Sequence, residues 1–287
     1  LPNTMECPLC PMTNDKELSD IPVDQYEVAI FTNRFSSLQL QDSKIPSLEL
    51  ETNQATGTCD VVSYSSNHQD QFSNLPQERI ELIIHALSNR TQELLENPNI
   101  KYILPFENKG KEIGVTLDHP HGQIYSFGHI PEIIKKQSIA QQGKPLENYL
   151  SKIPEELILK KNSTGICFVP RWARYPFEIW IVPYRRVPDI YSLSDDEKKD
   201  LAELMHDASK RLDGVFDTPM PYTLAWQLSP RGYEDSHHFH LCFQPIRRSK
   251  TKLKYLAGVE QITGFFLVDL PPERSAGILR GEEQPDE

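Results

Sequence analysis

The sequence predicts an α+β protein built from two related halves, and three observations lead to this prediction. Two segments carry apolar residues at helical spacing. Most of the remaining apolar residues fall in short β-rich runs, and 23 prolines punctuate the chain. The same order of elements occurs twice: two strands, a helix, a strand, and a strand with a His-x-His motif. With 38% hydrophobic residues among 287, the chain can form a packed core.

The two predicted helices have clear local signals. The first spans about 76–95, where Ile80, Ile83, Ile84 and Leu87 recur on one face and polar residues occupy the other. The second opens with a capping-box pattern at 194–197 and should end near Gly214.

The predicted strands are short runs rich in β-branched and aromatic residues. They cover 26–31, 59–64, 102–106, 165–169, 177–182, 222–226 and 253–259, besides the two His-rich strands. The many prolines favour edge strands and long surface loops between them.

An internal duplication explains the repeated order. Leu75 precedes His119 by 44 positions, and Leu193 precedes His238 by 45. Both segments end in His-x-His-x-polar-apolar, which places His121 and His240 at matching positions. Because order, spacing and motif agree together, we predict two domains, 1–140 and 141–287.

Composition excludes several classes of protein. A net charge of −11 argues against a nucleic-acid or membrane-surface binder. The sequence has no run of 18 apolar residues, and its start, 1–4, has neither region of a signal peptide. Five cysteines, an odd and sparse set, do not form a disulfide framework. We therefore expect a cytoplasmic protein.

The segment His119-Pro120-His121-Gly122-Gln123 is the strongest candidate for chemistry. Alternate residues of a strand share a face, so both imidazoles and the amide should point the same way. Imidazole acts as a nucleophile or acid–base group at neutral pH, and an amide donates to a phosphoryl oxygen. Gly122 should let a ligand or another backbone come close. Two structural histidines would give the same pattern.

Cys7-Pro8-Leu9-Cys10 is a candidate metal site or redox pair. Its position near the start, before a polar loop, does not fit the redox context between a strand and a helix. Tetrahedral zinc needs two more ligands, for which His68 and one of His119 and His121 are candidates; inert cysteines stay the other alternative.

The turn at 106–114 precedes the His-x-His strand with two glycines, two lysines and an asparagine. Such a turn can hold an anion, although an ordinary surface turn has the same composition.

Together these residues resemble the galactose-1-phosphate uridylyltransferases of the histidine-triad superfamily. The matching segments are 7–10, 31–35, the His68 turn with Leu75-Pro76, 106–110, 119–123 and 169–178. The resemblance implies two histidine-triad-like halves that form a largely antiparallel half-barrel sheet with flanking helices.

The resemblance also implies roles for single residues. His121 corresponds to the nucleophile that takes up the uridylyl group, and Gln123 to the side chain that steadies it. Zn²⁺ would be structural, with Cys7, Cys10, His68 and His119 as its ligands. The implied substrate contacts are Phe31, Asn33, Asn108, Lys109, Gly114, Thr116, Lys254 and Glu260. The segment 254–260 corresponds to a hexose-binding part often lent by a partner subunit, so a homodimer is expected.

The second half departs from the family pattern. Some members hold a second metal, for which Glu178 and His240 fit two ligand positions. Cys242 stands where a histidine would be, and Gln227 stands near the remaining position, so we expect no second metal. The glutamine of the hexose segment has no counterpart in 264–268.

The implied reaction exchanges a uridylyl group between UDP-glucose and a hexose 1-phosphate. One alternative is a phosphorylase of the same superfamily that uses adenine nucleotides, which the glycine at 122 slightly disfavours. Another is a zinc-stabilised relative without activity, against which the intact His121 and Gln123 argue.

Overall fold

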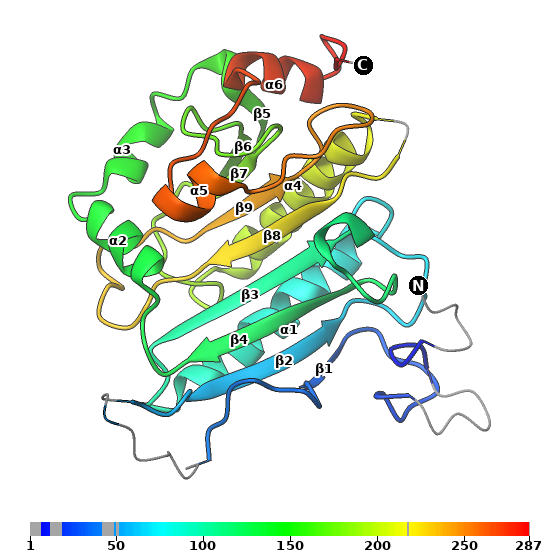
Figure 1. Cartoon of the computed structure of the whole chain (residues 1–287), viewed down its shortest axis with the longest axis vertical. Helices are drawn as coiled ribbons and strands as arrows, with labels where there is room; N and C mark the ends of the chain where they lie inside the picture. Colours follow the sequence, from blue (N-terminus) through cyan, green and yellow to red (C-terminus); the bar gives the residue numbers. More distant parts are fainter. Residues whose placement is uncertain (1–6, 12–18, 42–48, 50–51, 217, 287) are drawn as a thin grey trace.

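A computed structural model describes residues 7–11, 19–41, 49, 52–216 and 218–286. These residues form an open sheet of nine strands in the order β1-β2-β4-β3-β8-β9-β7-β6-β5 (Figure 1). All neighbouring strands pair antiparallel, which confirms the predicted α+β class with a largely antiparallel sheet.

Most of the predicted strands are present, with small changes at their ends. Their bounds are β1 Ala29–Thr32, β2 Gly57–Ser63, β3 Tyr102–Lys109, β4 His121–Phe127, β5 Ile158–Lys161, β6 Gly165–Phe168, β7 Ile179–Pro183, β8 Tyr222–Gln227 and β9 His240–Pro245.

Two long helices, α1 (Gln77–Leu95) and α4 (Asp195–Asp213), confirm the predicted pair. They lie together behind the sheet in Figure 1. At the start of α4, the Ser194 hydroxyl accepts from the Glu197 N–H and the Glu197 carboxylate accepts from the Ser194 N–H. This reciprocal cap satisfies two backbone donors that the helix itself leaves unpaired.

The core lies between these helices and the sheet. Ile80, Ile83 and Ile84 of α1 are fully buried, as are Ala202 and Met205 of α4. Fully burying a large aliphatic side chain contributes about 1.5–3 kcal/mol, so this apolar stripe fixes the helices on one face of the sheet. The other face of the sheet is left to carry the site.

The sheet order confirms the duplication. From its centre, the first half reads β3-β4-β2-β1 and the second reads β8-β9-β7-β6, with β5 added at the edge. In chain order, the long helix follows the second equivalent strand of each half: α1 lies between β2 and β3, and α4 lies between β7 and β8. β4 and β9, which begin with His121 and His240, are therefore equivalent.

One predicted strand, 253–259, was wrong. Leu253 forms an isolated bridge with Arg247, and helix α5 (Gly258–Thr263) begins soon after. β9 already has β8 and β7 on its two sides, so this β-rich segment finds no open strand edge there. Its residues from Tyr255 to Val259 are exposed instead.

The sequence analysis did not predict several smaller elements. They are α2 (Glu132–Ala140), α3 (Pro145–Leu150), α6 (Pro272–Leu279), β5, and the 3-10 helices η1 (Lys111–Ile113) and η2 (Glu155–Leu157). Within the described ranges, no helix combines the length and the apolar character needed to cross a membrane.

Candidate active site and metal centre

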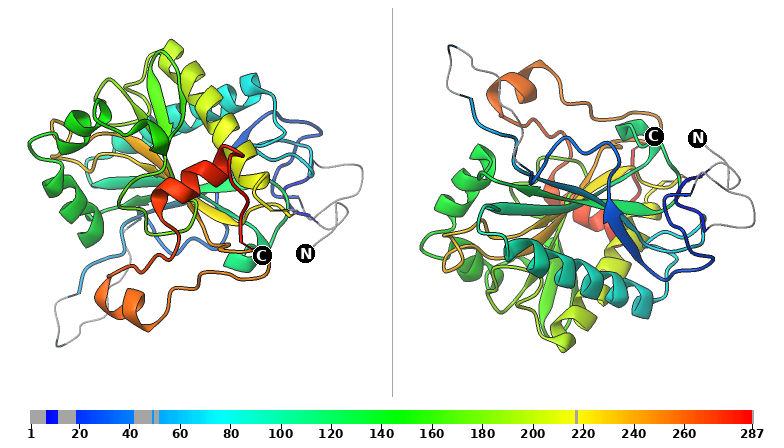
Figure 2. Two further views of the ribbon diagram at one scale, coloured as in Figure 1. Left: turned by 90° about the horizontal axis from the view of Figure 1, so that it is seen from above. Right: turned by 90° about the horizontal axis from the view of Figure 1, so that it is seen from below.

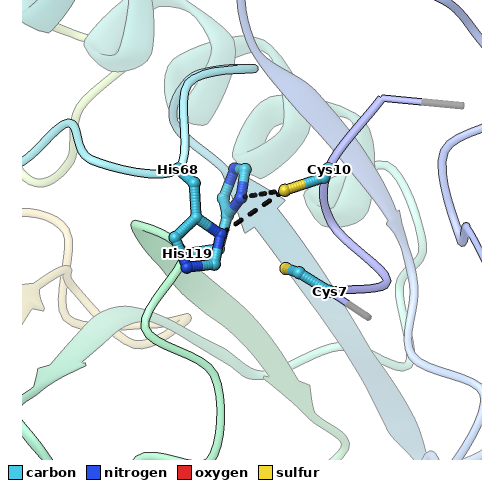
Figure 3. Close-up of side chains that lie close together, drawn as sticks. All are labelled: Cys7, Cys10, His68 and His119. Atoms are coloured by element: carbon cyan, nitrogen blue, oxygen red, sulfur yellow. Dashed lines mark hydrogen bonds between the residues drawn. The ribbon is translucent and has the colours of Figure 1, made fainter. Parts of the chain in front are cut away.

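Cys7, Cys10, His68 and His119 converge although they are far apart in the sequence. Their ligand atoms all lie within 4.8 Å of one another. The Cys10 sulfur is 3.4 Å from Nδ1 of both histidines (Figure 3). A tight turn, in which the Cys10 N–H donates to the Cys7 carbonyl, brings the two thiols to the same side. This group can hold a metal ion.

The turn that carries His68 is fixed by its own polar side chains. The Asp70 carboxylate accepts from the Ser65 hydroxyl at 2.5 Å and from the Asn67 amide at 2.8 Å. The Ser65 oxygen in turn accepts from the Asn67 N–H. His68 is thereby held toward the thiols before any metal binds.

The tautomer of His119 follows from its partners. Its Nε2 lies 2.7 Å from the Ser65 carbonyl, which can only accept, so Nε2 carries the proton. Its Nδ1 therefore presents a lone pair toward the Cys10 sulfur. Burial lowers the pKa of His119 to about 4, which keeps the ring neutral.

The same reasoning assigns the reactive atom of His121, the first residue of β4. Its Nδ1 donates to the His119 carbonyl at 2.7 Å, so the lone pair is on Nε2. Burial lowers the pKa of His121 below its ordinary value, although the bond to the carbonyl partly opposes this shift. Near pH 7 His121 is thus a neutral imidazole held in one orientation, as a nucleophile requires.

Gln123 shares the face of β4 with His121, as the strand period predicts. The prediction that His119 shares this face was wrong. β4 begins at His121, so His119 lies in the preceding loop, where it is buried beside Cys7, Cys10 and His68. Gly122 points to the opposite face, where an added Cβ would lie 2.0 Å from the Tyr64 hydroxyl oxygen. The close neighbours that require glycine are Tyr64 and the backbone of Phe106, which confirms the predicted close approach of another backbone.

A cavity of about 340 Å³ opens beside His121. Among its lining residues are Asn108 and Lys109 of β3 and Arg247, which follows β9. The Lys109 ammonium is 2.7 Å from the Asp213 carboxylate and lies over the Tyr222 ring. Lys109 therefore lines the same cavity as His121, and its charge is already paired.

Glu107 also lines this cavity, and the sequence analysis did not single it out. Its side chain is buried, and burial raises its pKa to about 8. Lys109 and the Tyr222 hydroxyl partly oppose this shift. The sequence offered one signal for Glu107, its place in the candidate anion-binding turn at 106–114. Its contact with Tyr222, which lies in the other half, could not be predicted from that turn.

The other residues predicted from the first half lie on β1, just after it, and in the loop before β4. Phe31 is in the same cross-strand row as Val61 and Gln123. The Asn33 side chain accepts from the Phe35 N–H at the end of β1. Gly114 has a φ of 84°, and Thr116 is exposed in the loop that leads to His119.

Lys254 and Glu260 are not brought to His121 within the chain. They form an ion pair of 3.1 Å and line a separate cavity with Tyr255 and Asp269. The predicted hexose segment and the predicted nucleophile therefore occupy two different cavities.

The second half repeats the histidine arrangement without the cysteines. His240 Nδ1 donates to the His238 carbonyl, and His238 Nε2 donates to the Pro183 carbonyl. The Trp180 ring stacks on His240, with centroids 4.2 Å apart. The position equivalent to His121 is thus covered by an indole.

The Glu178 carboxylate beside His240 is already occupied. It accepts from two backbone N–H groups, from the Trp180 indole and from the Cys242 thiol. A metal at this carboxylate would have to displace these donors.

Comparison with known proteins places the chain in a family. The model of the galactose-1-phosphate uridyl transferase N-terminal domain matches residues 2–131, and that of the C-terminal domain matches residues 132–284.

Curated relatives match nearly the whole chain. A galactose-1-phosphate uridylyltransferase of Thermotoga maritima is 33% identical, with 98% of this chain and 91% of the relative covered. The galactose-1-phosphate uridylyltransferase of Rattus norvegicus is 29% identical, over 95% of this chain and 76% of the relative.

Solved structures show the same architecture. A uridylyltransferase mutant superposes with a TM-score of 0.87 at 29% identity, covering 96% of this chain and 93% of the other. An ADP-glucose phosphorylase from Arabidopsis thaliana has a TM-score of 0.77 at 22% identity, with 91% and 83% covered, and this likeness concerns the fold alone. The chain, matched along almost its whole length, belongs to the galactose-1-phosphate uridylyltransferase family.

Proposed function

We propose that this protein transfers a uridylyl group from UDP-glucose to a hexose 1-phosphate, with galactose 1-phosphate as the acceptor. The observation that carries the proposal is the state of His121: a neutral ring whose Nδ1 proton is bound by a carbonyl and whose Nε2 lone pair is free to attack. The names of the relatives support the choice of substrates.

In the first step, Nε2 of His121 attacks the α-phosphorus of UDP-glucose. An N–P bond forms, and the bond from the α-phosphorus to the bridging oxygen breaks. Glucose 1-phosphate leaves with that electron pair and needs no proton, because phosphate is a good leaving group. The Gln123 amide donates to a non-bridging oxygen as charge builds on the phosphoryl group.

In the second step, a phosphate oxygen of the acceptor attacks the uridylyl phosphorus and the N–P bond breaks. The bonding electrons return to Nε2 of His121, which restores the free enzyme. Two displacements at phosphorus, with the imidazole as nucleophile in the first and as leaving group in the second, replace a direct attack of one anionic substrate on the other. The His119 carbonyl holds the Nδ1 proton throughout and stabilises the cationic ring of the intermediate.

The Cys/His group fits zinc, and we assign the metal on that fit. Sulfur and nitrogen ligands at ~2.3 and ~2.0 Å from a tetrahedral zinc lie about 3.5 Å apart. The Cys10 sulfur is 3.4 Å from both ring nitrogens. Four protein ligands leave no open position, so zinc would serve as a structural link between the cysteine turn and His119, two residues before His121.

A homodimer is part of this proposal. The segment with Lys254 and Glu260 stands away from the body of the sheet in both views of Figure 2. Ile262, Phe265 and Leu267 are more than half exposed in this segment. Apolar side chains in this number on one projection indicate a protein interface. A partner that covers them would bring its own 254–260 segment toward His121.

The proposal also includes the nucleotide contacts, the domain boundary and the location of the protein. Phe31, Asn33, Asn108, Gly114 and Thr116 would contact the nucleotide. The domain boundary near residue 140 is proposed together with them, although one sheet continues across it. A cytoplasmic location suits thiols that must stay reduced to bind a metal.

Incubation with UDP-glucose alone, followed by intact mass, tests the function. The expected product is one uridylyl group per chain, released again when galactose 1-phosphate is added. ADP-glucose in a parallel sample tests the alternative of an adenylyl phosphorylase. An adduct only with ADP-glucose, or with neither donor, would contradict the proposal.

Sedimentation and activity across a dilution series test the dimer. The activity per chain should fall as the dimer dissociates, and Phe265→Ser should move that transition to higher concentration. A monomer with full activity would refute the shared site.

A further inference from the structure

Tyr26 precedes β1, and its hydroxyl group contacts both parts of the site. The hydroxyl oxygen lies 2.6 Å from the Leu9 carbonyl, which is in the turn between the two cysteines. It lies 3.1 Å from Nε2 of His119 and 2.7 Å from the Ser63 hydroxyl. Ser63 faces His121 directly in the pairing of β2 with β4.

The protons of this network can be assigned. The Leu9 carbonyl only accepts, so the Tyr26 hydrogen goes to it. The Tyr26 oxygen then accepts from the Nε2–H of His119, which it shares with the Ser65 carbonyl. It also accepts from the Ser63 hydroxyl, whose contact with Tyr26 is shorter than its 3.4 Å contact with Ser65.

These bonds hold the Nε2 edge of the His119 ring, which is opposite the Nδ1 that faces the thiols. Two acceptors hold Nε2, so Nδ1 is directed at the thiols. The same residue supplies the carbonyl that binds Nδ1–H of His121. A tilt of His119 would therefore disturb both the metal ligand and the orientation of the nucleophile. Groups that hydrogen-bond the second ring nitrogen of a metal-binding histidine commonly set its tautomer and orientation in this way.

We propose that Tyr26 is a positioning residue that couples the Cys/His group to His121. Its hydroxyl orients His119 as a metal ligand, ties the cysteine turn to the sheet, and through the His119 carbonyl keeps Nε2 of His121 in its reactive orientation. The part that concerns His121 rests on the proposed function, whereas the part that concerns the metal ligand does not.

The test begins with Tyr26→Phe, which removes the hydroxyl and keeps the ring. Zinc-loaded protein is mixed with an excess of a colorimetric chelator, and the rate of zinc release is measured. Loss of a group that hydrogen-bonds a metal-binding histidine typically costs about 10–100-fold in metal affinity, so zinc release should be about 10–100-fold faster than from the wild type. Release at the wild-type rate would overturn the proposal.

Tyr102→Phe is the matched control. Tyr102 is fully buried, and its hydroxyl has no hydrogen-bond partner among the residues described. This variant should release zinc at the wild-type rate. Equal acceleration by both variants would mean that any lost tyrosine hydroxyl loosens the protein, and the specific role of Tyr26 would be rejected.

A second readout concerns the nucleophile. With UDP-glucose and galactose 1-phosphate, kcat of Tyr26→Phe should fall about tenfold or more, while KM for both substrates changes little, because Tyr26 orients His121 through another residue. A higher KM with unchanged kcat would contradict this part. If the wild type forms no adduct at all, the proposed function fails, and zinc release still decides the role of Tyr26.

Should Tyr26→Phe not fold, Ser63→Ala probes the same network. It removes one donor to the Tyr26 oxygen and should accelerate zinc release by a smaller factor. An unchanged rate in a folded Ser63→Ala protein would again count against the proposal.

Discussion

Replacing Glu107 by glutamine should remove a pH-dependent loss of stability. Glu107 is 6% exposed, and its carboxyl group accepts a hydrogen bond from the Tyr222 hydroxyl at 3.5 Å. Burial raises the pKa of Glu107 from 4.5 to about 8, with the charge of Lys109 acting in the other direction. Near pH 7 the folded protein therefore holds a proton on Glu107.

The sign of the effect follows from this difference. Between pH 4.5 and about 8 the folded state binds the proton and the unfolded state releases it. The free energy of unfolding therefore falls as the pH rises through this window. At about 1.4 kcal/mol for each pH unit, the loss from this group reaches about 4 kcal/mol near pH 8.

Urea unfolding at pH 5 and pH 8 measures this loss. Glu107→Gln has no proton to release, so the wild type should lose more stability than the variant between the two pH values. Glu112→Gln removes a carboxylate of the same cavity that is paired with Arg247, and it serves as the control. If the wild type and Glu107→Gln lose equal stability, Glu107 is ionised in the folded protein and the reasoning fails.

Three further predictions concern the strand of the nucleophile. His121→Asn should abolish the uridylyl adduct by intact mass and keep the zinc measured by metal analysis, whereas His119→Asn should lose the zinc; the reverse would exchange their roles. Gln123→Ala should still form adduct but slow turnover by roughly 10²–10³, since one oxyanion donor contributes about 3–4 kcal/mol. Gly122→Ala should destabilise the protein by about 1–3 kcal/mol in urea unfolding, because its Cβ would meet the Tyr64 hydroxyl, and adding Tyr64→Phe should recover part of the loss. No recovery in the double variant would show that the backbone of Phe106 sets the limit.

Local signals allowed the main elements to be predicted. The capping box of α4 and the apolar stripe of α1 depend on residues within one helix, and both helices begin within one residue of the prediction. The segment 253–259 has the composition of a strand, but composition cannot show whether a strand edge is available. Here β9 was already paired on both sides, and a surface loop with a short helix formed instead.

The site was predictable only where a strand period or a resemblance applied. The period of two placed His121 and Gln123 on one face. The convergence of His68 and His119 on the cysteine turn depends on contacts across the first half, so spacing alone left the ligands open and the resemblance named them. The pairing of Lys109 with Asp213 joins the two halves, and no local pattern carries that information.

The duplication gives each half a braced histidine, yet the two histidines differ in what surrounds them. In both, Nδ1 donates to the carbonyl two residues earlier, which leaves the Nε2 lone pair. His121 lines a cavity. His240 is 4% exposed beneath Trp180, and burial lowers its pKa to about 3. A substrate phosphorus can approach Nε2 only where the ring is uncovered, so the neighbouring side chains, and not the His-x-His motif, decide which half can react.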